Sequence, residues 1–148
     1  METVVLDNIR FRPDLEGLKR KLRVRDGERF ERLVEEAQAI ARPRALYGVA
    51  YIESKSESSV VLNGIRLDSR VLRVNLEQAQ RVFPYLGTCG TELHKWAAGQ
   101  ENILQQYYAD QIAEAALRQV LGVLQAHLKE QYQLGRTSTM SPGSLPDW

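Results

Sequence analysis

"LQQYYADQIAEAALRQVLGVLQAHL", residues 104–128, is the stretch that decides the fold predicted from the sequence. Apolar side chains recur along it every three or four residues, which is the spacing of one face of an α-helix. The members of this stripe are Leu104, Tyr108, Ile112, Leu117, Val120, Leu121, Leu124 and Leu128. We expect one long helix that packs along a whole domain and stops near Gly135, because glycine commonly follows a helix end.

The first part of the chain predicts helices. "VVLDNIRF" (4–11) alternates apolar and polar residues and indicates a short strand or hairpin. "RPDLEGLKRKLRV" (12–24) then has proline and aspartate at a plausible helix start. A stronger helix follows, with Asp26 as its N-cap, apolar residues at helical spacing and Pro43 as its stop.

The middle of the chain predicts strands. "ALYGVAYIESK" (45–55) is rich in strand-forming residues, and "SSVVLNGIRLDS" (58–69) indicates two strands about Asn63-Gly64, a pair suited to a type I′ turn. "RVLRVNL" (70–76) adds a further apolar run, and "EQAQRVFPYLGTCG" (77–90) carries a short helix into a strand. Strands in the middle and helices at both ends favour an α+β fold, with central antiparallel strands and flanking helices.

The organisation predicted for the chain is one module spanning residues 1–148. Its parts are a helical region (1–44), a strand-rich region (45–90), long helices (91–135) and a closing loop (136–148). A chain of 148 residues is long enough to bury a sizeable core.

Composition excludes several classes of protein. A formal net charge of +1 predicts no nucleic-acid partner, and the single cysteine excludes an internal disulfide and fits a reducing compartment. The start of the chain lacks the charged flank and apolar run of a signal peptide. The longest apolar run, "ALYGVAYI", is far shorter than the roughly 20 residues that span a bilayer. We therefore expect a cytoplasmic protein with no membrane partner.

Metal and thiol chemistry are both weakly indicated. Cys89, His94 and His127 lack the spacing of a zinc site. In "GTCGTELH" (87–94) the thiol precedes a predicted helix, whose dipole would lower the pKa of the thiol. A catalytic pair of Cys89 and His94 also needs a third group to orient the base, and none is identifiable. The pattern favours a small buried cysteine over a thiol enzyme.

Two groups of charged residues could bind a ligand or could be ordinary solvent-exposed surface. "LKRKLRVR" (18–25) holds five basic residues, but acidic residues follow at once and no aromatic residue is interspersed. An amphipathic helix with a solvated basic face is favoured over a patch that contacts phosphates. Asp110 and Glu114 lie four residues apart and so share one helix face. They suit a cation or an ammonium group, although spacing alone favours a solvated pair.

The closing stretch "GRTSTMSPGSLPDW" (135–148) is the most informative. Pro142-Gly143 demands a turn, because proline fixes φ and glycine permits conformations that other residues avoid. Glycine also lets a ligand approach the backbone. The alternative for this stretch is a solvated tail.

The order of these parts resembles the activation domain of cobalamin-dependent methionine synthase, and more closely the free-standing activation-domain-like proteins of anaerobic bacteria. The resemblance covers the chain from about Ala45 onward. It rests on "VVLNGIRLDSRVLRVNL", "LGTCGTELHKW", "YYADQIAEAALRQVLGVLQAHL" and "MSPGSLPDW" in that order. In the family the chain continues beyond this loop, so we expect the fold to be incomplete at the C-terminus.

The resemblance implies a function. Such a domain binds S-adenosylmethionine and presents it to a cobalamin or other corrinoid, carried by a methyltransferase or corrinoid protein, whose cobalt has become inactive. One electron, from a flavoprotein or a ferredoxin, and the methyl group together reactivate it. The cofactors carry the difficult chemistry, and the domain positions them.

The resemblance also implies site residues. In the family's ligand loop, an arginine for the methionine carboxylate precedes a Pro-Gly-Tyr turn. Here Pro142 and Gly143 match the turn, Ser144 replaces the tyrosine, Thr139 stands in the place of the arginine, and Arg136 is the nearest guanidinium.

Loss of a bidentate charge-assisted pair, normally worth about 1.5–3 kcal/mol, predicts at least about tenfold weaker binding. Asp110 and Glu114 are candidates, by residue type, for holding the amino group. The alternative prediction is a protein-interaction module whose ligand site has decayed.

Overall fold

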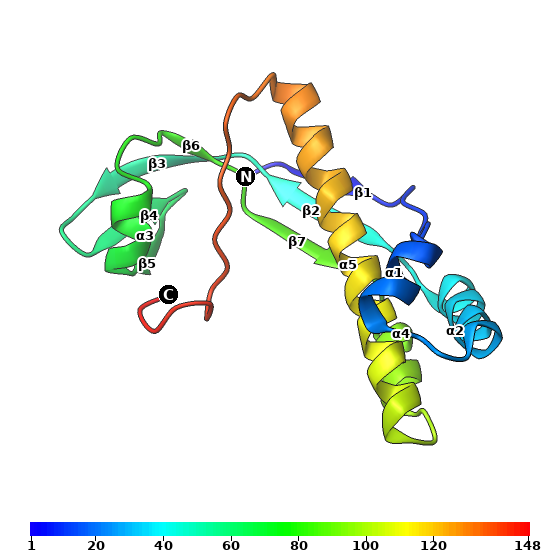
Figure 1. The fold of residues 1–148 in the computed structure, drawn as a ribbon. Helices are drawn as coiled ribbons and strands as arrows, with labels where there is room; N and C mark the ends of the chain where they lie inside the picture. Colours follow the sequence, from blue (N-terminus) through cyan, green and yellow to red (C-terminus); the bar gives the residue numbers. More distant parts are fainter. The chain divides into compact units, whose positions relative to one another are not determined.

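The computed structural model describes residues 1–148, and its secondary structure is α+β, as predicted (Figure 1). In chain order the elements are β1 (Thr3–Leu6), α1 (Leu15–Leu22), α2 (Gly27–Ile40), β2 (Arg44–Gly48), β3 (Ala50–Lys55), β4 (Ser59–Leu62), β5 (Ile65–Asp68), α3 (Arg70–Asn75), β6 (Arg81–Val82), β7 (Tyr85–Thr88), α4 (Thr91–Ala98) and α5 (Ile103–Tyr132). One sheet has the order β1-β2-β7, and the other has the order β5-β4-β3-β6. Neighbouring strands of the four-stranded sheet are antiparallel, also as predicted.

The chain divides into two compact units. The sheet unit comprises Met1–Val4, Tyr47–Tyr85 and Leu134–Trp148, and the helical unit comprises Val5–Leu46 and Leu86–Gln133. The four-stranded sheet and α3 belong to the sheet unit, whereas α1, α2, α4 and α5 belong to the helical unit.

The helical unit is built on α5, which packs against α4 and α2. Its buried side chains are Phe30, Leu33, Val34 and Ala37 of α2, Leu93 and Ala97 of α4, and Ala109, Ile112, Ala116, Val120, Leu124 and Leu128 of α5. The predicted long helix is confirmed, but four members of its predicted stripe are not buried, and of these Tyr108 and Leu121 are half-buried. Leu104 is 59% exposed and Leu117 is 37% exposed, whereas Ala109 and Ala116 of the same helix are buried.

Polar side chains fix the segment that leads into α1. The backbone of Arg12 donates to Oε1 of Gln119 at 2.7 Å, and Nε2 of Gln119 donates back to the Arg12 carbonyl at 2.6 Å. Asp14 then caps α1 by accepting from the Gly17 amide at 3.1 Å, and Asp26 caps α2 as predicted. The helices at the start of the chain therefore begin where the sequence indicates.

The sheet unit is organised by the hairpin of β4 and β5. Asn63 has φ of 47° and Gly64 has φ of 77°, so both adopt the left-handed conformations that a type I′ turn requires. The register pairs Leu62 with Ile65, directly beside the turn, and Val60 is fully buried. The predicted hairpin is confirmed.

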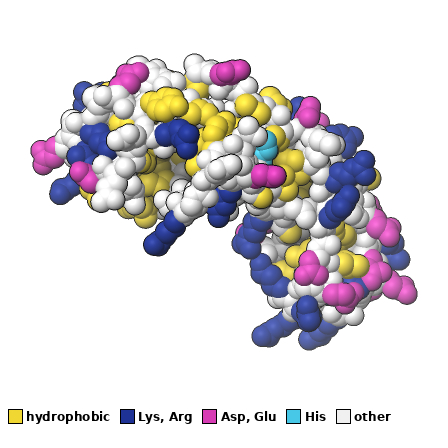
Figure 2. Space-filling model, turned by 90° about the horizontal axis from the view of Figure 1, so that it is seen from above, with side chains coloured by type: hydrophobic (Ala, Val, Ile, Leu, Met, Phe, Trp, Pro, Cys, Tyr) yellow, Lys and Arg dark blue, Asp and Glu magenta, His cyan; other side chains and the backbone are white.

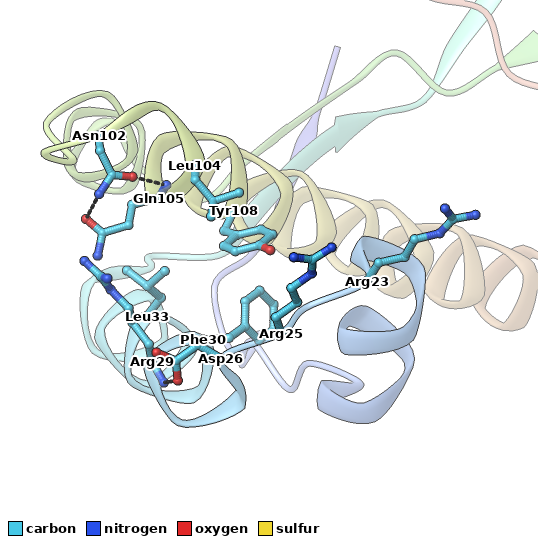
Figure 3. Close-up of a pocket in the computed structure, with 10 residues that line it drawn as sticks. All are labelled: Arg23, Arg25, Asp26, Arg29, Phe30, Leu33, Asn102, Leu104, Gln105 and Tyr108. Carbon is cyan, nitrogen blue, oxygen red and sulfur yellow. Dashed lines mark hydrogen bonds between the residues drawn. The ribbon is translucent and has the colours of Figure 1, made fainter.

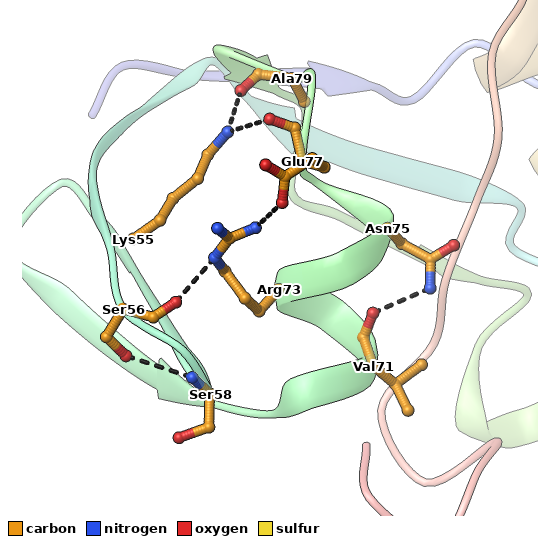
Figure 4. A network of polar contacts seen from close by, with 8 residues as sticks. All are labelled: Lys55, Ser56, Ser58, Val71, Arg73, Asn75, Glu77 and Ala79. Carbon is orange, nitrogen blue, oxygen red and sulfur yellow. Dashed lines mark hydrogen bonds and ion pairs between the residues drawn. The ribbon is translucent and has the colours of Figure 1, made fainter.

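A polar network fastens α3 to the neighbouring strands (Figure 4). Nζ of Lys55 donates to the carbonyls of Glu77 at 2.7 Å and Ala79 at 3.0 Å. Nε of Arg73 donates to the Ser56 carbonyl at 2.7 Å, and its guanidinium forms an ion pair with Glu77. Lys55 and Arg73 thus donate hydrogen bonds to three backbone carbonyls that lie outside the strands and helices.

Three local predictions for the middle of the chain are wrong. Residues 45–55 form two strands, because the backbone breaks at Val49. Residues 70–75 are helical, since Oγ of Ser69 accepts from the Leu72 amide at 3.0 Å and so starts α3. The short helix expected within 77–90 is absent, and β6 and β7 occupy that stretch.

Charges of both signs are interspersed among apolar patches on the face shown in Figure 2. None of the helices combines the length and the apolar character that crossing a membrane requires.

Candidate functional site

The closing loop is ordered around the predicted Pro142-Gly143 turn. Gly143 has φ of 82°, and its amide donates to the Trp148 carbonyl. Within the turn, Oγ of Ser144 donates to the Ser141 carbonyl at 2.6 Å. A Cβ at Gly143 would meet no atom within 4 Å, so the position requires glycine for its backbone conformation rather than for space.

Asp147 attaches this loop to the start of α3. Its Oδ2 accepts from the Val71 amide at 2.9 Å and from Oγ of Ser69 at 3.2 Å. The Val71 amide is the main cause that lowers the pKa of the Asp147 carboxyl, with smaller contributions from Ser69 and Arg70 and with desolvation opposing. Within the sheet unit, the loop is therefore attached to the start of α3 and is not a free tail.

Sequence reasoning missed Asp147. Two features of the sequence could have indicated it. Ser69 is a potential helix N-cap, and Asp147 follows a proline in "LPDW" near the end of the chain. The two sites are 76 or more residues apart in sequence, so only the fold joins them.

The five loop residues singled out by the resemblance lie in one exposed segment of the sheet unit. They are Arg136, Thr139, Pro142, Gly143 and Ser144. The Arg136 guanidinium is exposed and makes no ion pair, so its charge is available to a ligand carboxylate. Thr139 is exposed as well and brings no charge.

The acidic pair lies in the other unit. Asp110 and Glu114 are both exposed on α5 in the helical unit. Glu114 forms an ion pair with Arg118 one turn further along the helix. This places Glu114 in an ordinary surface pair and leaves Asp110 without an ion-pair partner.

Two polar atoms of the loop segment are withheld from solvent without a hydrogen-bond partner. They are Oγ1 of Thr137 and Nε1 of Trp148. A buried polar group without a partner costs about 1–3 kcal/mol, which makes such groups unusual in a folded chain. The loop thus holds one exposed guanidinium and two buried polar atoms without partners.

Cys89 has the environment of a structural cysteine. Its side chain is buried, with 7% exposure, and this burial raises the pKa of its thiol. His94 lies exposed on α4. A raised thiol pKa opposes nucleophilic chemistry, because the thiolate is the reactive form. No cluster of three or more His, Cys, Asp or Glu side chains suits a metal ion.

Comparison with known proteins adds no assignment to this geometry: no protein-family model matches the chain, and neither does any curated protein.

Proposed function

We propose that the chain is an S-adenosylmethionine-binding module that supports reductive methylation of a corrinoid cofactor carried by a methyltransferase or corrinoid protein. The observation that carries this proposal is the ordered closing loop, in which Gly143 adopts a positive φ and Asp147 binds the start of α3. The loop follows the long helix α5, which is the order of parts in the activation domains that the sequence resembles.

The loop supplies contacts suited to the methionine end of the ligand. Arg136 offers a guanidinium for the carboxylate, and such charge-assisted bonds are the strong ones. The open space around Gly143 leaves room for a ligand to reach the exposed backbone of the turn.

The bound ligand would supply a methyl group on a positively charged sulfur, which is transferred to the corrinoid cobalt together with one electron from an external donor. The sulfur leaves as a neutral thioether, so no side chain of this chain needs to act as a general acid. The role of the loop is to hold the carboxylate and the backbone-facing part of the ligand in one orientation. Asp110 and Glu114 stay predictions for the amino group.

Calorimetric titration of S-adenosylmethionine into the chain tests the proposal, with the demethylated product as the second ligand. We expect saturable binding that weakens about tenfold in Arg136→Ala, because one charge-assisted bond is lost. Arg66→Ala is the matched control, since Arg66 is an exposed arginine of the same unit that pairs only with Asp68. Equal affinities in the two variants would remove the role of Arg136, and absence of binding to the unmodified chain would refute the proposal.

A second function is favoured by the exposed apolar side chains of the sheet unit. Tyr51, Ile65 and Val74 are 58%, 63% and 61% exposed. These side chains suit a docking module that retains its partner but no longer binds the ligand, in keeping with Thr139 in the place of an arginine. Co-elution with a corrinoid protein, without heat from S-adenosylmethionine, would support this alternative.

A further inference from the structure

A cavity of about 360 Å³ opens in the helical unit where α2 and α5 begin (Figure 3). Its lining is basic, with Arg23, Arg25 and Arg29, and also includes Phe30 and Tyr108, while Figure 3 shows the Arg23 side chain extending away from the other labelled residues. Every lining residue belongs to the helical unit, so the cavity shares no residue with the closing loop. Its volume lies within the range of about 300–1,000 Å³ that is typical of small-molecule sites.

The lining of this cavity carries a net positive charge. Three arginines and one aspartate line the cavity, which gives it a formal charge of +2 (3 − 1). Arg23 and Arg25 make no ion pair. By contrast, Lys19 of the same basic run is occupied by Glu16 and Glu31.

The third arginine also keeps its charge. Figure 3 shows the Arg29 side chain reaching toward Gln105. With the Gln105 amide oxygen turned toward it, Nε of Arg29 donates to that oxygen at 2.6 Å. An amide is neutral, so this contact orients the guanidinium without neutralising it.

Two helix N-termini reinforce the positive potential. Asp26 caps α2 by accepting from the Arg29 amide at 3.2 Å, and Asn102 caps α5 by accepting from the Gln105 amide at 2.9 Å. Both cap residues line the cavity. The N-terminal end of a helix carries about half a positive charge, and it favours nearby anions.

The floor of the cavity is aromatic. Phe30 is 1% exposed and packs edge-to-face against Tyr108, with their ring centroids 5.5 Å apart. Leu104, on the rim, keeps 59% of its surface exposed and so leaves apolar area uncovered. Arg25 and Tyr108 both line the cavity, so its lining combines cationic and aromatic side chains.

We propose that this cavity binds a phosphate-bearing ligand with an aromatic ring, of which a nucleoside phosphate is the simplest case. Arginines bind phosphate oxygens in a planar, bidentate geometry, and several of them with two helix ends suit a multiply charged group. The ring of the ligand contacts Tyr108 and Leu104, whereas Asn102 and Gln105 offer amide groups to its polar edge. The basic run at residues 18–25 thereby gains a role that its sequence alone does not favour.

Titration calorimetry with ADP, adenosine and pyrophosphate tests both halves of the proposed ligand. We expect saturable binding of ADP, and binding of adenosine and of pyrophosphate at least about tenfold weaker, because each lacks one set of contacts. ADP affinity should fall with rising salt, since exposed charges are screened. Pyrophosphate binding as tight as ADP would overturn the aromatic part of the proposal, and adenosine binding as tight as ADP would overturn the phosphate part.

The matched variants are Arg25→Gln and Arg32→Gln. Both arginines are exposed and neither makes an ion pair, but Arg32 lies on α2 outside the cavity lining. We expect about tenfold weaker ADP binding in Arg25→Gln and unchanged binding in Arg32→Gln. Amide chemical shifts on ADP addition should change around residues 25, 29 and 105. Equal ADP affinity of the two variants, or shifts confined to other regions, would overturn the proposal.

Discussion

In the helical unit, three helices bury apolar side chains against one another, whereas in the sheet unit hydrogen bonds from side chains to backbone join α3, the strands and the closing loop. In the helical unit, Ile112 and Val120 of α5 are fully buried. In the sheet unit, Asp147 accepts a hydrogen bond from the Val71 amide and Arg73 donates one to the Ser56 carbonyl. Both hydrogen bonds are exposed to solvent. Apolar burial is insensitive to pH, while a carboxylate that accepts backbone hydrogen bonds is sensitive to it. The two units should therefore respond to different perturbations.

The largest effect should come from Ile112→Ala in α5. Ile112 has no exposed surface, so the substitution leaves a cavity in the helical core and should lower the free energy of unfolding by about 2–5 kcal/mol. Urea unfolding followed by circular dichroism measures this change. The control is Leu117→Ala on the same helix, where 37% exposure predicts a smaller loss of about 1 kcal/mol. Similar losses from both would mean that the helical unit is not held by this core.

Ser69→Ala should have a smaller effect, in the sheet unit. The Ser69 hydroxyl accepts from the Leu72 amide and donates to Asp147, so its removal uncaps α3 and loosens the closing loop. We expect a loss of about 1–2 kcal/mol in the free energy of unfolding. Ser58→Ala, at an exposed serine nearby, is the control. Hydrogen exchange should quicken in α3 before it does in α5, and the reverse order would contradict the comparison.

Gly143→Ala tests the turn itself. An alanine at φ of 82° is strained although no atom blocks its Cβ, so we expect a local cost of about 1 kcal/mol. Faster exchange of the residue 143 amide measures it, because that amide donates to the Trp148 carbonyl. Gly135→Ala has equal space and no positive φ, and should leave this amide unaffected.

The smallest effect should appear on acidification. Hydrogen bonds, first of all from the Val71 amide, lower the pKa of Asp147 below its ordinary value of 3.8. The attachment of the loop is therefore fully present above that value and is lost as the pH falls through the lowered pKa. Carboxyl-carbon NMR of Asp147 follows the titration directly. Asp147→Asn should abolish the pH dependence of loop exchange, and a titration above 3.8 would show that the bonds to Val71 and Ser69 are absent in solution.

The sequence predicted the elements whose causes are local. Periodicity predicted α2 and α5, and Asn63-Gly64 predicted the hairpin, because spacing and turn chemistry act within a few residues. The strand predicted at residues 70–76 is wrong, because the Ser69 N-cap outweighs the strand preference of the valines there.

Residues that meet only in the fold were harder to foresee. Asp147 and Val71 are 76 positions apart, and Arg25, between α1 and α2, lines the same cavity as Tyr108 of α5, so neither grouping leaves a pattern in the sequence. Within the candidate site, the Pro142-Gly143 turn was foreseen from its own two residues. The attachment of the turn to α3 was not.

The division into units has a consequence for how the protein is made. The sheet unit takes three segments of the chain and the helical unit takes two, in alternation. During synthesis, all residues of the helical unit have left the ribosome once Gln133 has emerged. At that point residues Leu134–Trp148 of the sheet unit have not yet emerged. Neither unit corresponds to one uninterrupted stretch of gene. A recombination event that moved the helical unit in one piece would also carry Tyr47–Tyr85 of the sheet unit, and one that moved the sheet unit would carry the entire helical unit.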